Sequence, residues 1–259
     1  MAAEIVRVPD LAALHESAAD AFVSAAVDAV RERGIFRVAL AGGSTPEGMY
    51  TLLAHDSSRR SEVPWPHVHF FWGDERHVPP DHSDSNFRMA WEAMLAHLPI
   101  KPGQIWRIKG EYEDASKAAN EYEHDLRRAF DIGEGRWPEF DLILLGMGAD
   151  GHTASLFPGT AALQEQRRLA LANRVQKLDT DRITLTAPVL NNAVSVLFLV
   201  HGADKAEALK DVLEGAYQPD RRPAQLVRPS RGRLRWIVDQ SAARLLSPVS
   251  VVDAQATGR

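Results

Sequence analysis

The sequence contains no cysteine. Disulfide bonds, zinc–thiolate sites and thiol nucleophiles are therefore excluded, and the reducing cytoplasm is the location that we expect. The chain also lacks a long apolar run. Even the apolar segment from Val194 to Val200 is far too short to cross a bilayer. Its first residues show no basic region followed by an apolar core, so we expect no secretory signal.

Basic residues are not in excess. Lys and Arg total 30 against 35 Asp and Glu, which gives a formal net charge of −5 at pH 7. This balance argues against a general nucleic-acid binder and leaves any anionic ligand to a local basic patch. We therefore expect neither nucleic acid nor a membrane as a partner.

Short apolar segments alternate with amphipathic ones, and no Pro/Gly/Ser-rich linker divides the 259 residues. The sequence therefore predicts one α/β domain over residues 1–259, with the first strand at an edge of the sheet. Strands are predicted at residues 5–8, 36–41, 68–72, 105–108, 142–145, 168–175, 182–185, 194–200 and 234–238, and helices at 11–33, 46–53, 87–97, 114–130, 187–192, 203–213 and 241–246.

The segment Asp141 to Pro158, DLILLGMGADGHTASLFP, is central to the interpretation. Leu142 to Leu145 is an apolar run without a polar interruption, which is typical of a strand buried on both faces of a parallel sheet. The glycine-rich turn that follows carries Asp150 and His152. Ligands bind beyond the carboxyl ends of strands in open α/β sheets, so this carboxylate and imidazole are suited to acid–base chemistry. A capping aspartate and a surface histidine are the alternative.

A second turn, AGGSTP, follows the strand predicted at 36–41. Gly42 and Gly43 would let backbone N–H groups approach an anion, and Ser44 and Thr45 could donate hydrogen bonds to it. We expect Ser44 or Thr45 to cap a helix that begins at Pro46. The turn has neither the Gly-Lys-Ser/Thr ending of a nucleotide-binding loop nor the dinucleotide pattern. It predicts a phosphate site, with an ordinary capped helix as the alternative.

A third turn, Gly73 to Arg76, follows the strand predicted at 68–72. Asp74 and Glu75 are candidate acid–base groups, and Arg76 could meet an anion. A solvated acidic loop is the alternative for most of this segment. No spacing requires a metal ion, so none is predicted, although several nearby side chains could in principle bind one: His67, His69, His77, Asp81, His82 and Asp84.

Two isolated cations lie at the ends of predicted elements. Arg182 begins a strand, and Lys205 lies near the start of a helix. Each could be ordinary surface charge. Their positions also make them candidate phosphate ligands.

Taken in order, several blocks of sequence resemble 6-phosphogluconolactonases. They are AGGSTP, FFWGDERHVPPDHSDSNF, LGMGADGHTASLFPG, RITLT and HGADKAEAL, and they extend from about Leu40 to Leu209. The family is similar in fold to glucosamine-6-phosphate deaminases. The resemblance therefore implies a Rossmann-like, open, mostly parallel sheet with helices on both faces.

The resemblance also implies an activity. It is hydrolysis of 6-phospho-D-glucono-1,5-lactone to 6-phospho-D-gluconate, the second step of the oxidative pentose phosphate pathway, with no organic cofactor. The loop from Gly43 to Thr45, together with Arg182 and Lys205, would face the phosphate, and His152 would face the lactone carbonyl near Asp150. The expected partner is thus a small phosphosugar lactone, and we expect a monomer or weak homo-oligomer.

The related deaminases supply one alternative. They need a glutamate shortly after their Asp-Gly-His, in a segment resembling Asn-Glu-Pro, to open the sugar ring. This chain has Leu156-Phe157-Pro158 there, and phenylalanine cannot transfer a proton. Lactone hydrolysis needs only an activated water and a proton for the leaving group.

A non-catalytic phosphosugar sensor is a second alternative. Similar folds serve as effector domains of regulators, which need a DNA-binding or partner domain. No such domain is visible, and the Asp150–His152 pair is intact.

The third turn is where the resemblance and the residue chemistry agree least. In the deaminases the aspartate that matches Asp74 moves a carbon-bound proton, and a lactonase has no such proton to move. We therefore expect Asp74 to be structural or to orient the substrate, through sugar hydroxyls or the Gly42–Gly43 turn. Arg76 is predicted to stabilise the oxyanion, with a surface ion pair as the alternative.

Overall fold

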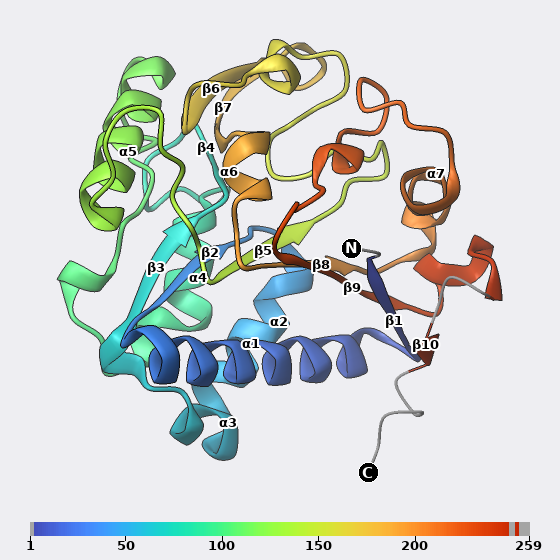
Figure 1. Cartoon of the computed structure of the whole chain (residues 1–259), viewed down its shortest axis with the longest axis horizontal. Coiled ribbons are helices and arrows are strands. Elements are labelled where there is room, and N and C mark those ends of the chain that lie inside the picture. The colour runs from blue at the N-terminus through green and yellow to red at the C-terminus, as the bar shows by residue number, and fades with distance from the viewer. Residues whose placement is uncertain (1–2, 249–251, 254–259) are drawn as a thin grey trace.

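The computed structural model describes residues 3–248 and 252–253. A parallel sheet crosses this part of the chain, with the strand order β10-β1-β9-β8-β5-β2-β3 (Figure 1). All neighbouring strands in this order run parallel, as the hydrophobic runs predict. The strands are β1 (Glu4–Val8), β2 (Phe36–Leu40), β3 (Val68–Trp72), β5 (Leu142–Gly146), β8 (Ser195–Val200), β9 (Arg233–Asp239) and β10 (Val252–Asp253).

Helices cover both faces of this large sheet, which confirms the predicted fold class. In Figure 1, α1, α2 and α3 lie below the sheet, and α5 and α6 lie above it. The α-helices are α1 (Leu11–Arg33), α2 (Ser44–His55), α3 (Ser57–Glu62), α4 (Asn86–Ala93), α5 (Ala115–Phe130), α6 (Ala187–Asn191) and α7 (Ala206–Glu214). Short 3₁₀ turns are η1 (Trp65–His67), η2 (Leu95–His97), η3 (Pro102–Gln104), η4 (Ala161–Gln164), η5 (Gln176–Leu178), η6 (Ala203–Lys205), η7 (Pro223–Leu226) and η8 (Ala242–Leu245).

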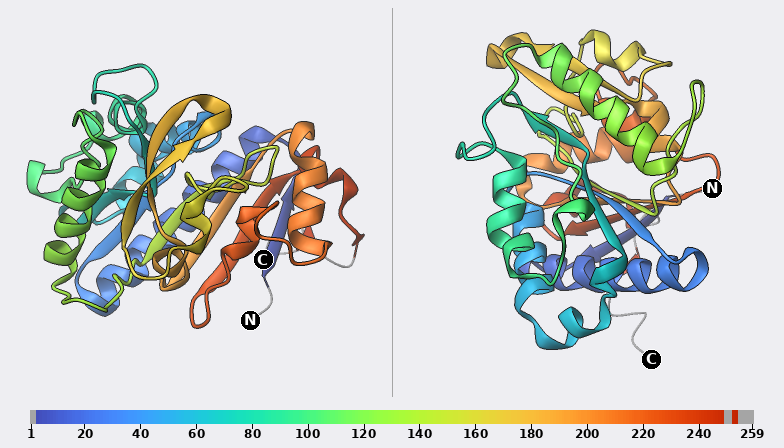
Figure 2. Two further views of the ribbon diagram at one scale, coloured as in Figure 1. Left: turned by 90° about the horizontal axis from the view of Figure 1, so that it is seen from above. Right: turned by 90° about the vertical axis from the view of Figure 1, so that its left-hand side faces the viewer.

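A smaller antiparallel sheet has the order β4-β7-β6. It consists of β4 (Asp74–Arg76), β6 (Ala170–Val175) and β7 (Thr180–Leu185). Figure 2 shows the gold β6–β7 hairpin beside α5, above the large sheet. The sequence predicts β6 and β7 but gives residues 73–76 as a turn. That prediction is wrong for Asp74–Arg76, because these residues pair with β7 immediately after leaving β3.

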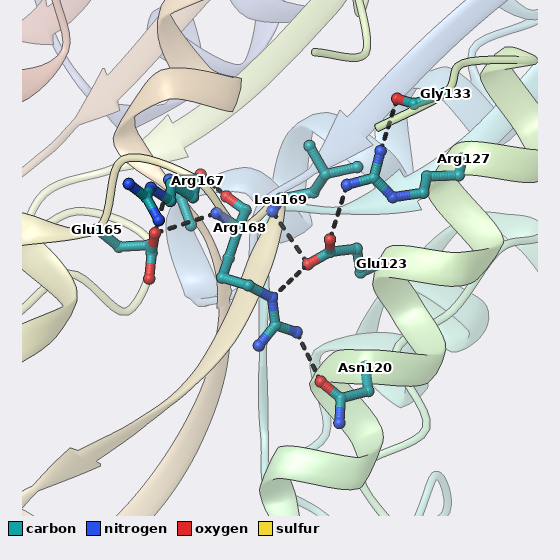
Figure 3. A network of polar contacts seen from close by, with 9 residues as sticks. Asn120, Glu123, Arg127, Gly133, Glu165, Arg167, Arg168 and Leu169 are labelled. Carbon is teal, nitrogen blue, oxygen red and sulfur yellow. Dashed lines mark hydrogen bonds and ion pairs between the residues drawn. The ribbon is translucent and has the colours of Figure 1, made fainter. Parts of the chain in front are cut away.

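A polar network joins the small sheet to α5 (Figure 3). Glu123 on α5 accepts hydrogen bonds from Arg168 Nε at 2.7 Å, from Arg127 Nη2 at 2.9 Å and from Leu169 N at 3.2 Å. Burial alone would raise the pKa of Glu123, but the arginine hydrogen bonds outweigh burial and lower it. The ionised carboxylate therefore fixes the chain just before β6.

Local sequence accounts for most element ends. Asp10 caps α1, accepting a hydrogen bond from Ala13 N at 2.9 Å, and α1 ends at Gly34 in the left-handed conformation. α2 departs from the prediction, because it begins at Ser44 and Gly43 is its N-cap. The helix predicted to reach His97 ends at Ala93, since Met94 leaves the helical conformation before η2. The expected helix at 241–246 is the 3₁₀ turn η8.

Two strand predictions are wrong at the sheet edges. Residues 105–108 form no strand, because after η3 the chain meets β3 only through the bridge between Ile105 and Phe70. β1 is not an edge strand, because Val6 pairs with Val252 of β10. Both errors come from contacts between distant parts of the chain, which local periodicity does not report.

Two buried tyrosine hydroxyls complete the ends of β2 and β3. Tyr50 donates to Ala41 O at 2.9 Å and accepts from Ala41 N at 3.0 Å. Tyr122 likewise donates to Trp72 O at 2.8 Å and accepts from Trp72 N at 3.0 Å. Burial raises the pKa of both phenols, so they stay protonated and can donate and accept at once. The chain thus enters two site loops from firmly held strand ends.

Candidate active site

A cavity of about 640 Å³ lies at the carboxyl ends of β8, β5, β2 and β3. The strands β5 and β2 are neighbours in the sheet. After β2 the chain passes through α2 to β3, on the side of β2 away from β5, whereas β8 lies on the side of β5 away from β2. The loops after β2 and β5 therefore diverge, which leaves a crevice where α/β sheets bind ligands. The loop residues that line it come from four strand ends and the β6–β7 hairpin.

The turn after β2 forms one wall. Gly42, Gly43, Ser44 and Thr45 all line the cavity, and the 12-residue helix α2 begins there. A Cβ at Gly42 would lie 1.8 Å from the Asn86 side-chain oxygen, so only glycine permits this approach. The N-terminal N–H groups of a helix and its dipole favour an anion at such a position.

Cations converge on the same cavity. Arg182 on β7 lies opposite Arg76 on β4 in the register, and both line the cavity. Burial, and then the neighbouring Arg76, lower the pKa of Arg182 from its usual value, which does not prevent an arginine from carrying charge at neutral pH. Lys205 also lines the cavity, with its Nζ 2.7 Å from Asp204 Oδ2. Such guanidinium and ammonium groups can bind a phosphate.

The turn after β5 brings the predicted acid–base residues together. His152 Nδ1 lies 2.5 Å from Asp150 Oδ1, so the carboxylate orients the imidazole. A Cβ at Gly148 would lie 2.1 Å from His152 Nδ1, so the absence of a side chain permits this fold-back. Burial by itself raises the pKa of Asp150, but hydrogen bonds from His152 and Lys177 lower it well below its usual range.

The surroundings of His152 are partly apolar. Its ring stacks on Phe157 with the centroids 4.1 Å apart and the planes at 22°. Lys177 forms an ion pair with Asp150 Oδ2, and its Nζ lies 5.0 Å from the Phe157 ring centroid. His152 lines the cavity, whereas Asp150 does not and contacts the site through His152.

The strand β4, which follows β3 after Gly73, presents Asp74 to the cavity, and the hydrogen-bond donors to Asp74 are uncharged. Asp74 Oδ2 accepts a hydrogen bond from Ser155 Oγ at 2.6 Å. Asn86 Nδ2 donates to the Asp74 carbonyl at 2.9 Å. These contacts hold Asp74 beside the Gly42 approach described above.

Glu75 and Arg76 differ in their surroundings. Glu75 is only 2% exposed and accepts hydrogen bonds from Asn86 N at 2.7 Å and Phe87 N at 2.8 Å. Burial raises the pKa of this carboxyl, which these hydrogen bonds only partly offset. Glu75 is thus the anchor of the acidic segment rather than a solvated or catalytic group. Arg76 faces the cavity and donates to the Asp84 carbonyl.

No cluster of histidine and carboxylate side chains suited to a metal ion occurs among residues 3–248 and 252–253. Within the same described ranges, no helix is long and apolar enough to span a membrane.

Some cavity residues escape local sequence reasoning. Ser155, Lys177 and His201 line the cavity but were not predicted. Ser155 lies in the central glycine-rich segment, and its position there could have indicated it. Lys177 reaches the site only because the β6–β7 hairpin folds over the large sheet. His201 directly follows β8, so its position at a strand end was a usable signal.

The fold and the cavity together define a class: an α/β protein in which a helix start, several cations and an aspartate–histidine pair meet at one crevice. A family model described as "Glucosamine-6-phosphate isomerases/6-phosphogluconolactonase" matches residues 9–236. The chain belongs to this family.

Individual relatives agree. A 6-phosphogluconolactonase from Synechocystis sp. is 43% identical over 220 residues, covering 85% of this chain and 88% of that protein. One from Rattus norvegicus is 40% identical, covering 83% and 82%. The structure of a Trypanosoma cruzi 6-phosphogluconolactonase superposes with a TM-score of 0.82 at 28% identity, covering 95% and 98%. A monomeric glucosamine-6-phosphate deaminase shares the fold, with a TM-score of 0.76 at 21% identity, covering 93% and 99%.

Proposed function

We propose that this chain hydrolyses 6-phospho-D-glucono-1,5-lactone to 6-phospho-D-gluconate. The names of its relatives support the activity, since those proteins are 6-phosphogluconolactonases. The observation that carries the proposal is the Asp150–His152 hydrogen bond of 2.5 Å at a cavity that also contains a helix N-terminus, Arg182 and Lys205.

In the mechanism that we propose, the substrate phosphate binds at the start of α2. Backbone N–H groups and hydroxyls of Ser44 and Thr45, together with Arg182 and Lys205, provide the donors. The lactone end then extends toward His152, which lines the same cavity. Asp74 orients the sugar hydroxyls.

His152 is the general base. Its Nδ1–H donates to Asp150, which leaves Nε2 free to take a proton from the water that attacks C1. A C–O bond forms as water adds, and Arg76 stabilises the oxyanion. The bond from C1 to the ring oxygen then breaks, and the imidazolium returns its proton to that oxygen, giving the acid and a free hydroxyl.

Phe157 favours this reaction over deamination. Its ring stacks on His152 in the segment where the deaminases need a glutamate. An apolar ring cannot transfer the proton that opens an amino sugar ring, but it can shield the imidazole that activates water. An assay with glucosamine 6-phosphate should therefore show no ammonia release.

Replacement of His152 tests the mechanism. His152→Ala should lower kcat by ~10²–10⁴-fold, the usual contribution of general base catalysis. The measurement is acid release from freshly prepared lactone at constant pH, after subtraction of spontaneous hydrolysis.

A control for this experiment is His201→Ala. His201 lines the same cavity, and its Nδ1 lies 3.1 Å from the carboxylate of Asp239, so it is also a histidine beside an acid. His201→Ala should change kcat far less than His152→Ala. His201 lies on the loop that carries Lys205, a proposed phosphate ligand, and not on the turn that carries Asp150. Near-full kcat in His152→Ala would refute the assignment.

The remaining sequence predictions accompany this proposal. A cytoplasmic location and a monomeric or weakly homo-oligomeric state stay predictions, as does the pathway step.

A further inference from the structure

Lys177 has a position that the proposed mechanism does not yet use. It lies in η5, the turn between β6 and β7, and it lines the cavity. Its Nζ pairs with Asp150 Oδ2, and it also lies over the Phe157 ring. The lysine thus contacts the carboxylate and the ring that together surround the imidazole of His152.

The two oxygens of Asp150 have different partners. Oδ1 accepts from His152, at 2.5 Å from Nδ1 and 3.1 Å from the backbone N. Oδ2 faces Lys177. The carboxylate is therefore fixed from both sides, and a rotation that weakened its contact with His152 would also break the ion pair.

We propose that Lys177 is a positioning residue for lactone hydrolysis: it fixes Asp150 against His152 and offsets the carboxylate charge beside the imidazole. This inference rests on the proposed role of His152 as the base. Lys177 acts through Asp150, and the structure shows it in contact with Asp150 and Phe157.

The direction of the charge effect follows from the groups that face His152. Asp150 is the carboxylate in direct contact with the imidazole, and it favours the protonated ring. Lys177 opposes this charge at close range. The guanidinium of Arg222 donates from Nη1 to the Asp150 carbonyl at 3.1 Å, and its Nη2 pairs with the Asp211 carboxylate at 2.8 Å. The other charged or titratable side chains lining the cavity are Asp74, Arg76, Arg182, His201, Asp204 and Lys205.

Loss of the lysine charge should therefore leave Asp150 uncompensated and favour the imidazolium, which cannot act as a base. Two unit charges near a protein surface interact by a few kcal/mol at most, and exposure reduces this value. The Lys177 side chain is 51% exposed, so the modest end of the range applies. The acid limb of the pH–rate profile should move to higher pH by about half a unit to one unit.

The experiment compares Lys177→Met, which keeps an unbranched apolar stem, with Lys177→Arg, which keeps the charge. Steady-state kinetics from about pH 5 to pH 9 should show the shifted acid limb in Lys177→Met, equal to about three- to tenfold in kcat on that limb. KM should change less than about twofold, because Lys177 does not contact the proposed phosphate site. Lys177→Arg should restore the wild-type profile.

Arg174→Met is the matched control. Arg174 lies on the same hairpin, is equally exposed and pairs with Asp179 and Asp181, but it contacts neither Asp150 nor His152. Its pH–rate profile should match that of the wild type. A thermal unfolding curve for each variant separates loss of fold from loss of positioning.

Other outcomes would overturn the inference. An unchanged acid limb with a raised KM would make Lys177 a substrate contact, and a wild-type profile with wild-type KM would make it an ordinary surface ion pair. His152→Ala keeps this test separate from the proposed function. If that variant loses activity while Lys177→Met matches the wild type, only the role of Lys177 fails.

Discussion

Asp74 and Asp150 each lie soon after the end of a parallel strand, Asp74 lining the cavity and Asp150 reaching it through His152, and their partners differ. Asp74 accepts hydrogen bonds from the uncharged Ser155 and Asn86. Asp150 contacts an imidazole and an ammonium. In the proposed mechanism these partners, rather than the residue type or its place after a strand, assign Asp74 to substrate binding and Asp150 to the reaction.

The largest effect should come from exchanging the two carboxylates for amides in turn. Asp150→Asn should lower kcat by ~10²–10⁴-fold, because an amide can present its NH₂ to His152 and favour the wrong tautomer. Asp74→Asn should cost less than about tenfold, because its amide oxygen can still accept from Ser155. Measurement of kcat and KM for both variants at one pH decides the matter. An Asp74→Asn variant as damaged as Asp150→Asn would make Asp74 an acid–base group.

Arg76 tests whether the binding side also assists the chemistry. Arg76→Ala should depress kcat/KM by as much as ~10²–10³-fold, comparable to losing one oxyanion donor. Arg88→Ala is the control, since Arg88 on α4 pairs with Glu92 away from the cavity. If both variants behaved alike, Arg76 would be a surface cation tied to the Asp84 carbonyl.

Arg182 tests the same comparison through the affinity for the substrate. Arg182→Ala should raise KM by about 10- to 150-fold, equivalent to about 1.5–3 kcal/mol for one charge-assisted hydrogen bond. Titration with the phosphorylated lactone measures this change, and unphosphorylated gluconolactone serves as the comparison substrate. The variant should discriminate less between the two. Equal rates of the wild type on the phosphorylated and unphosphorylated lactones would show that Arg182 and Lys205 do not bind the phosphate.

The smallest effect concerns acid stability. The pKa of Asp150 is depressed in the fold from its ordinary value of 3.8. For such a carboxyl, the stabilisation is present above the unfolded pKa and is lost as pH falls through the folded one. The thermal stability advantage of the wild type over Asp150→Asn should therefore persist from about pH 8 to pH 4 and shrink below that. An advantage that vanished near neutral pH would contradict the depressed pKa.

The sequence predicted the strands of the large sheet except β10, and the loops at their carboxyl ends, because buried runs and glycine turns are local features. The glycine turn indicated Asp150 and His152, whereas the family resemblance placed Arg182 in the same site. β4 escaped prediction because its three residues are polar and pair only with a strand more than a hundred positions away. Lys177 escaped for a similar reason, since its contact with Asp150 depends on how a hairpin folds over the sheet. Glu75 was predicted as a candidate acid–base group, with a solvated loop as the alternative, because its burial is not visible in a charged segment.

The tyrosines at the ends of β2 and β3 have a consequence for local opening. Amides at strand termini usually fray and exchange their hydrogens with solvent early. Here each phenol holds both the N–H and the C=O of one residue, Ala41 or Trp72, in a buried position. The amides of Ala41 and Trp72 should therefore exchange as slowly as those of the strand interiors. Any movement of the two site loops should begin after these residues. The loops can then move without disrupting the sheet that supports them.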